Sequence, residues 1–228
     1  MNVILNEILE NADEKYKIFQ SKLIPTIEMD SVLGLRAPIS HKIAKKYANT
    51  DIGREFLSSL PHKYYDENIV HAFMLGRLKV SHAELKKHLT DFLPHVDNWA
   101  VCDGLVAHTK SFFNEPSAYG FTVECIKSGE AYTVRFGLVS LLCYYIDKEH
   151  IFDVLEICKS IKGDEYYVNM ALAWLISFCL IKEYEKSIPL IESKTLGRWV
   201  QNKSIQKACE SYQIDENKKT YLRSLKIK

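Results

Sequence analysis

Four side chains at related positions along the chain could act together on a positively charged aromatic substrate. Trp99 and Asp103 are four residues apart in DNWAVCDGLVAHTK, so on a helix they share one face, one turn apart. Arg135 and Trp174 lie in the next two blocks of the chain. Indole faces attract a cationic ring, a carboxylate can stabilise a developing positive charge or position water, and a guanidinium can bind a phosphate. The set therefore predicts a site for a cationic, planar substrate.

Each of these residues also has an ordinary structural interpretation. Trp99 and Trp174 lie in apolar segments, where an indole more often belongs to the core. Asp103 could cap or kink a helix or pair with a lysine, and Arg135 could form an ion pair between repeats or bond to a neighbouring helix end. Taken singly, the structural interpretation is the better one for each residue. Their combination at related positions along the chain favours a functional site.

The elements that position these residues are indicated by an aromatic that recurs every 33 or 34 residues: Tyr65, Trp99, Tyr132, Tyr166 and Trp199. A period of this size is typical of stacked helical pairs. Four positions after each aromatic stand Ile69, Asp103, Phe136, Met170 and Lys203, so a carboxylate replaces an apolar side chain in one repeat. We predict an all-α chain of HEAT-like helical-pair repeats that form a curved α-solenoid, an alpha-alpha superhelix.

Turn residues precede four of these aromatics with the same period: Pro61, Pro94, Gly129 and Gly163. Pro or Gly just outside a helix start suits a connection between stacked helices. Before the repeats, the pattern predicts one helix from about Asn2 to Leu23, interrupted by Pro25, and a helix that starts near Pro38. The tetratricopeptide pattern is absent. The sequence shows no linker and no change of composition that would mark a second domain, so we predict one domain over residues 1–228.

Composition excludes several classes of protein. The longest uncharged apolar runs, Phe136 to Ile146 and Met170 to Ile181, are too short to cross a bilayer. The first residues, MNVILNEILENADEKYK, are not those of a secretory signal. Six cysteines lie scattered in mostly apolar stretches, with no C-x-x-C pair and no histidine cluster at metal-ligand spacing. We expect a cytoplasmic protein with reduced, buried thiols and no metal.

The formal net charge of +1 hides an asymmetry along the chain. Residues 194–228 hold nine Lys or Arg and three Asp or Glu, whereas residues 1–193 hold 21 basic and 26 acidic residues. The basic end could bind a polyanion. The alternative is a solvated terminal helix pair, which charge counts alone favour.

The motifs together resemble the AlkD-like family of DNA alkylation repair glycosylases, all-helical proteins of HEAT-like repeats. The resemblance covers nearly the whole chain, through GLRAP, LPHKYYDENIVHAF, FLPHVDNWAVCD, YTVRFG, YYVNMALAW and WVQNKSIQKACESY. It implies that Asp103 is the catalytic carboxylate, that Trp99 and Trp174 are aromatic walls, and that Arg135 contacts the DNA backbone. With the basic end, it also predicts DNA contacts for Lys203 and Lys207.

The implied activity is hydrolysis of the N-glycosidic bond of cationic alkylated purines, 7-methylguanine or 3-methyladenine, in double-stranded DNA. Alkylation makes the base a good leaving group, so a carboxylate near C1′ that stabilises an oxocarbenium-like sugar is the main requirement. The resemblance implies no metal or organic cofactor and a monomeric protein. Two alternatives remain: a catalytically silent module that binds damaged or branched DNA, and a protein-interaction scaffold, the commonest use of helical solenoids.

Overall fold

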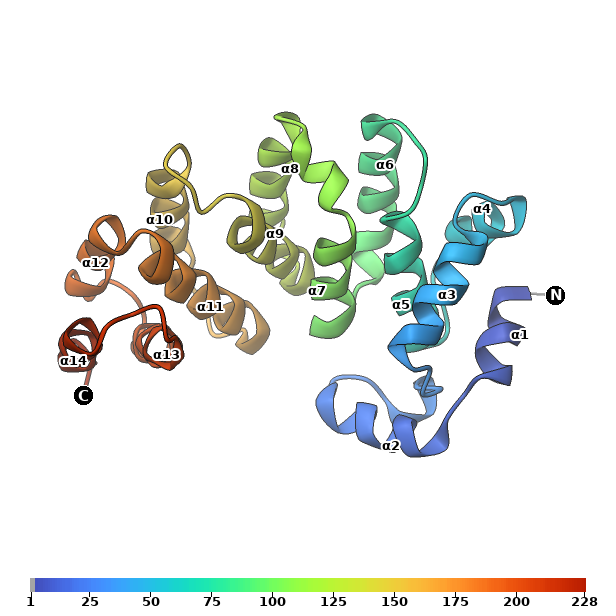
Figure 1. The fold of residues 1–228 in the computed structure, drawn as a ribbon, viewed down its shortest axis with the longest axis horizontal. Coiled ribbons are helices and arrows are strands. Elements are labelled where there is room, and N and C mark those ends of the chain that lie inside the picture. Colours follow the sequence, from blue (N-terminus) through green and yellow to red (C-terminus); the bar gives the residue numbers. More distant parts are fainter. Residues whose placement is uncertain (1–2) are drawn as a thin grey trace. The chain divides into compact units, whose positions relative to one another are not determined.

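The computed structural model describes residues 3–228, and every regular element in this range is helical (Figure 1). There are fourteen α-helices and three short 3-10 helices among these residues. By their contacts they form two compact units, residues 1–121 and 122–228, divided within α8 (Ser117–Ile126). The prediction of an all-α chain is confirmed. The prediction that residues 1–228 act as one domain stays a prediction.

In the first unit, alternate helices pack against one another in chain order. Helix α5 packs between α3 and α7, while α4 and α6 connect them. Figure 1 shows these helices side by side in blue to green. The elements of this unit are α1 (Val3–Glu10), α2 (Glu14–Leu23), η1 (Met29–Ser31), α3 (Ala37–Tyr47), α4 (Asp51–Ser58), α5 (Tyr65–Leu75), α6 (His82–Phe92), η2 (Leu93–His95), α7 (Trp99–His108) and η3 (Lys110–Asn114).

The second unit repeats this arrangement. Helix α11 packs between α9 and α13, and α10, α12 and α14 flank them. The elements are α9 (Ala131–Tyr144), α10 (Ile151–Ser160), α11 (Tyr166–Lys182), α12 (Tyr184–Glu192), α13 (Arg198–Glu210) and α14 (Glu216–Ser224). Stacking of alternate helices is the packing of an α-solenoid, as predicted from the period. The HEAT-like form of the repeat stays a prediction.

The recurring aromatic marks the start of five of the stacked helices. It is the first residue of α5, α7 and α11 and the second residue of α9 and α13. The glycines predicted to lie in turns have backbone angles that favour glycine, with φ of 83° at Gly129 and 129° at Gly163. The period therefore predicted the helix starts and the glycine turns before α9 and α11, whereas Pro94 lies in the 3-10 helix η2.

The predicted N-terminal helix is wrong in its extent, because the chain forms two helices there. Asn2 lies outside the described residues, α1 ends at Glu10 and α2 begins at Glu14. The break has a local cause: the Asp13 side chain accepts a hydrogen bond from the backbone N–H of Tyr16 at 2.9 Å and caps α2.

Most of the cysteines are buried, as predicted. Cys102, Cys125, Cys158 and Cys179 are buried, whereas Cys143 is exposed and Cys209 is half-buried. Among the described residues, none of the helices combines the length and the apolar character needed to span a bilayer.

Candidate functional site

Helix α7 carries Trp99 and Asp103 as its first and fifth residues. The helix begins there because the Asn98 side chain accepts a hydrogen bond from the Val101 N–H at 3.0 Å. The helix runs without interruption to His108, so Asp103 lies in its interior and is not a cap. The four-residue spacing therefore places both side chains on one helix face, as predicted.

The indole of Trp99 is fixed by a contact across the first unit. Its Nε1 donates a hydrogen bond to the backbone oxygen of Leu23, the last residue of α2, at 2.9 Å. Trp99 is half-buried and does not belong to the buried core. The bond orients the ring while leaving part of it accessible, as an aromatic wall of a binding site requires.

Helix α2 is in turn held against α5. The Gln20 side chain donates to the Tyr65 hydroxyl at 3.1 Å, in a buried contact. The neighbouring Asp66 carboxylate accepts hydrogen bonds from the backbone N–H groups of Leu33 at 2.6 Å and Leu35 at 2.7 Å. Burial raises the pKa of Asp66, and these N–H donors oppose that shift. The first repeat aromatic and its neighbour thus position the segment that holds Trp99.

Asp103 is half-buried, and the residue after it allows a close helix contact. A Cβ added at Gly104 would lie 3.4 Å from Cε1 of Phe73 on α5, at ordinary van der Waals contact with that ring. A half-buried carboxylate in a helix interior can stabilise a cationic centre without the full screening of bulk water. This geometry suits the predicted catalytic role, which stays a prediction.

In the second unit, Trp174 and Lys207 line the same pocket. Trp174 lies on α11 and Lys207 on α13, two helices that pack together, and the pocket has a volume of about 300 Å³. Trp174 is half-buried, and its ring meets Phe178 edge to face with centroids 6.1 Å apart. Glu210 lines this pocket as well, so the pocket carries one basic and one acidic side chain beside the indole. The roles of Trp174 as an aromatic wall and of Lys207 as a phosphate contact stay predictions.

Arg135 lies on α9 and is only 4% exposed. Its Nη1 donates a hydrogen bond to the backbone oxygen of Tyr167, near the start of α11, at 2.9 Å. This bond is the inter-repeat contact given above as the structural interpretation of Arg135. The phosphate contact predicted for Arg135 stays a prediction.

Lys203 also has a structural setting on α13. Its Nζ donates to Oε1 of Gln206 at 3.1 Å and lies 5.8 Å from the centroid of the Trp199 ring. The candidate residues are thus divided between the units: Trp99 and Asp103 in the first, and Arg135, Trp174, Lys203 and Lys207 in the second.

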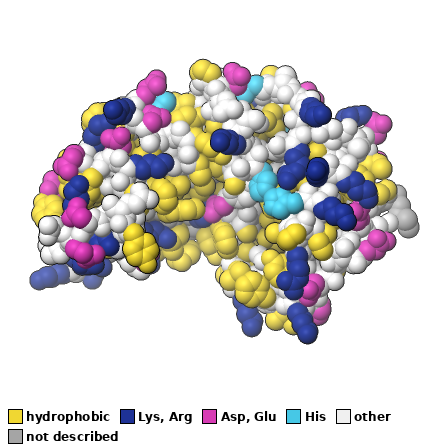
Figure 2. Space-filling model, in the orientation of Figure 1, with side chains coloured by type: hydrophobic (Ala, Val, Ile, Leu, Met, Phe, Trp, Pro, Cys, Tyr) yellow, Lys and Arg dark blue, Asp and Glu magenta, His cyan; other side chains and the backbone are white. Residues whose placement is uncertain are grey.

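The sequence interpretation missed an aromatic layer on the first unit. The ring of Phe73 stacks on His41 and on His108, with centroids 4.4 and 4.0 Å away, and Nη2 of Arg77 lies 3.1 Å from Nδ1 of His41. Burial lowers the pKa of both histidines. Figure 2 shows a group of histidine side chains on this unit. The two histidines are 67 residues apart, two repeat periods, so the period itself could have paired them.

A second missed feature is the apolar surface of α2. Ile18, Phe19 and Leu23 are between 43% and 55% exposed, and Met29 in η1 is 43% exposed. Figure 2 shows apolar side chains gathered over this helix. Because the backbone of Leu23 accepts the bond from Trp99, this surface adjoins the tryptophan side of the candidate site.

Residues 4–209 match the model of a protein family described as DNA alkylation repair enzyme. The matched range contains all six candidate residues. The chain has no significant match to a curated protein or to a solved structure.

Proposed function

We propose that this chain, which belongs to the DNA alkylation repair enzyme family, is a DNA glycosylase that hydrolyses the N-glycosidic bond of cationic alkylated purines in double-stranded DNA. The observation that carries the proposal is the pair on α7, where Asp103 follows an oriented, half-buried Trp99 by one turn. We name 7-methylguanine and 3-methyladenine as the substrates because alkylation at N7 or N3 leaves the purine with a positive charge.

The proposed reaction needs a carboxylate more than an acid. The bond between C1′ and the base nitrogen breaks, and its electron pair neutralises the cationic base, which leaves without being protonated. The sugar becomes an oxocarbenium-like cation, which the Asp103 carboxylate stabilises. Water then adds to C1′ and loses one proton, for which Asp103 is a suitable acceptor.

Aromatic and basic side chains supply recognition in this proposal. Trp99 in the first unit attracts the cationic ring of the lesion through its π face, and Trp174 in the second unit supplies a further aromatic contact to the damaged DNA. Lys203, Lys207 and the donors of Arg135 bind backbone phosphates, and the basic count of residues 194–228 supports this role. We further propose that the protein works as a monomer in the cytoplasm.

Substrate charge provides a direct test. We would incubate the protein with duplexes that contain 7-methylguanine, 3-methyladenine or uracil and measure the free base released. The expected result is release of the two cationic purines and no release of uracil, because a neutral base lacks the charge that weakens the glycosidic bond. Equal release of uracil would contradict the proposed basis of specificity, and release of none would contradict the glycosylase activity.

A DNA-binding module without catalysis is the second candidate, favoured by one observation. Arg198, Lys203 and Lys226 line one pocket on the second unit, and no carboxylate lines it with them. If the protein only binds DNA, it will retard abasic or branched duplexes in an electrophoretic assay and release no base from any of the three lesions.

A further inference from the structure

We propose that the second unit carries a binding site for an unpaired nucleotide of single-stranded DNA, built on α13 around Trp199. The site goes beyond the glycosylase proposal and does not depend on it. It combines a pocket lined by cations, which suits phosphates, with an exposed indole, which suits the face of an unpaired base.

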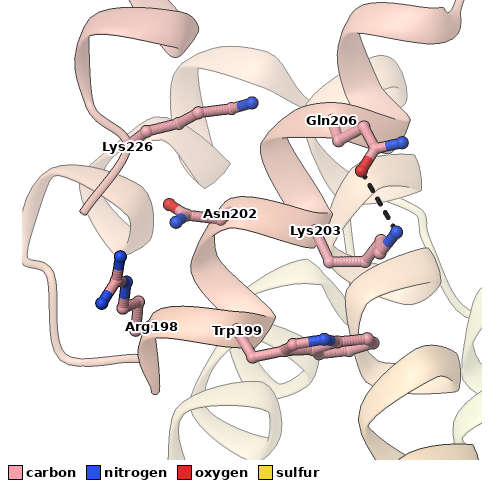
Figure 3. Close-up of a pocket in the computed structure, with 6 residues that line it drawn as sticks. All are labelled: Arg198, Trp199, Asn202, Lys203, Gln206 and Lys226. Atoms are coloured by element: carbon pink, nitrogen blue, oxygen red, sulfur yellow. Dashed lines mark hydrogen bonds between the residues drawn. The ribbon is translucent and has the colours of Figure 1, made fainter. Parts of the chain in front are cut away.

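The pocket has a volume of about 450 Å³ and its lining is basic. Figure 3 shows the six residues around it: Arg198, Trp199, Asn202, Lys203, Gln206 and Lys226. No carboxylate lines the pocket, and within residues 3–228 none of its three cations takes part in an ion pair. Three cations that form no ion pair with the described residues surround one hollow and attract a phosphate-bearing ligand.

The indole of Trp199 supplies the aromatic surface. The residue is 41% exposed, and the ring also lines a second pocket of about 360 Å³, whose lining includes Asp164, Tyr166, Asn169 and Arg198. Tyr166 meets it at an interplanar angle of 63°, with centroids 5.8 Å apart. The ring is therefore supported at its edge and accessible from solvent. Exposed aromatic rings beside cations are the stacking surfaces on which proteins bind unpaired bases.

The C-terminal segment is fixed so that it contributes to the pocket. The Asn202 side chain donates to the backbone oxygen of Ile227 at 2.8 Å and accepts from its N–H at 2.9 Å. Gln201 donates to the backbone oxygen of Leu225 at 3.2 Å. These three bonds place Lys226 beside α13. The cations of the pocket thus come from two segments that are already held together, which lowers the entropic cost of binding.

The chemistry of the pocket selects among nucleic-acid ligands. A cationic alkylated purine is repelled by three positive charges, so this is not a second site for the lesion. A continuous duplex offers phosphates but keeps its base faces stacked inside the helix. A single strand offers both phosphates and free base faces, and it is the ligand that uses Trp199 as well as the cations.

The test is the affinity for a fluorescein-labelled decathymidylate, measured by anisotropy. Trp199→Ala is expected to weaken binding about fivefold or more, because stacking contributes about 1–3 kcal/mol per base. Trp199→Phe, which keeps an aromatic ring, should retain most of the affinity. A decamer of abasic residues has the same charge without bases and should bind wild-type protein more weakly by a similar factor, which tests the site without any variant.

The cations are tested by salt dependence. Arg198→Ala/Lys226→Ala should make the slope of log K against log salt shallower by about 1.4, since each phosphate contact to a single strand contributes about 0.7. The matched control is Lys148→Ala/Lys159→Ala, the same charge change in the same unit outside the pocket, which should leave the slope unchanged.

The proposal is overturned if the abasic decamer binds as tightly as decathymidylate, or if Trp199→Ala binds as wild type does. It is also overturned if the control pair changes the slope as much as the pocket pair. Loss of base excision in these variants is not required, so the site and the glycosylase proposal can fail separately.

Discussion

The indole Nε1 of Trp99 donates a hydrogen bond to the backbone oxygen of Leu23, which precedes it by 76 residues. This bond connects the first residue of α7 to the last residue of α2. Asp103 follows one helical turn after the tethered ring. A side chain whose orientation is set by the fold is pre-organised for binding and needs no rearrangement when a substrate arrives.

Removal of this bond should affect both stability and activity. Trp99→Phe keeps an aromatic ring but has no donor, so we expect the free energy of unfolding to fall by about 1 kcal/mol. The excision rate should fall on the order of tenfold or more, because the ring is no longer held in place. The control is Trp199→Phe. The indole N–H of Trp199 donates to none of the described residues, so this substitution removes no such hydrogen bond. Chemical denaturation and base release measure the two effects. Equal stability of both variants would contradict the role of the bond.

Asp66 should be a stability determinant rather than a catalytic group. Asp66→Ala leaves the half-buried N–H of Leu33 and the buried N–H of Leu35 without their acceptor, and we expect a loss of about 3 kcal/mol in the free energy of unfolding. Asp30→Ala, an exposed carboxylate in the same segment, is the matched control and should cost less than about 0.5 kcal/mol. Urea titrations of both variants measure the loss in the free energy of unfolding. A loss confined to excision would instead move Asp66 into the site.

Stability should fall with acidification because of a contact between the half-buried His62 and the buried His71. Nε2 of His62 lies 2.9 Å from Nδ1 of His71, and their rings stack on Phe56 and Phe92. Burial lowers the pKa of His62 to about 4 and places that of His71 well below its usual range, with the neighbouring histidine charges adding to both shifts. Between about pH 6.5 and pH 4 the unfolded chain therefore binds more protons than the folded one.

The free energy of unfolding should accordingly decrease as the pH falls through this window. In His62→Gln, the slope should be smaller than in wild type by up to about 1.4 kcal/mol per pH unit, the contribution of one proton. Denaturant titrations at a series of pH values between 7 and 4.5 give both slopes. Identical slopes would show that His62 binds protons alike in the folded and the unfolded chain, which would contradict the lowered pKa.

Trp174 and Lys207 should separate lesion selectivity from general DNA affinity. Trp174→Ala should reduce the preference for a lesion duplex over an undamaged duplex, with little loss of stability, because the ring is half-buried at a pocket. Trp174→Phe should keep most of the preference. Lys207→Ala should weaken binding to both duplexes equally and reduce the salt slope by about 0.9. A large stability loss with unchanged preference would assign Trp174 to packing.

The repeat period predicted the parts of this structure that depend on local sequence. It marked the starts of five stacked helices and the glycine turns before α9 and α11, because helix starts and positive-φ turns are set by neighbouring residues. The prediction of a single N-terminal helix was wrong at Asp13. This residue caps α2 and so begins a second helix. Asp is a preferred N-cap residue, so Asp13 could have been recognised in the sequence as the start of a second helix.

Contacts between distant segments could not be predicted from the sequence. Nothing near Leu23 indicates that its backbone oxygen accepts a bond from Trp99, and nothing near Arg135 indicates that it is buried and bonded to the Tyr167 carbonyl. Such bonds use backbone atoms, which every residue has, so residue type carries no signal for the partner. The sequence therefore indicated the residue types of the candidate site, whereas the structure was needed to place them.

The central claim is that the Asp103 carboxylate stabilises the transition state of base excision. The most direct measurement is the single-turnover rate of 7-methylguanine release from duplex DNA by wild type, Asp103→Asn and the control Asp91→Asn, an exposed carboxylate on α6. We predict a loss of about a hundredfold or more for Asp103→Asn, with unchanged thermal stability, and no loss for Asp91→Asn. Undiminished release by a folded Asp103→Asn protein would contradict the claim.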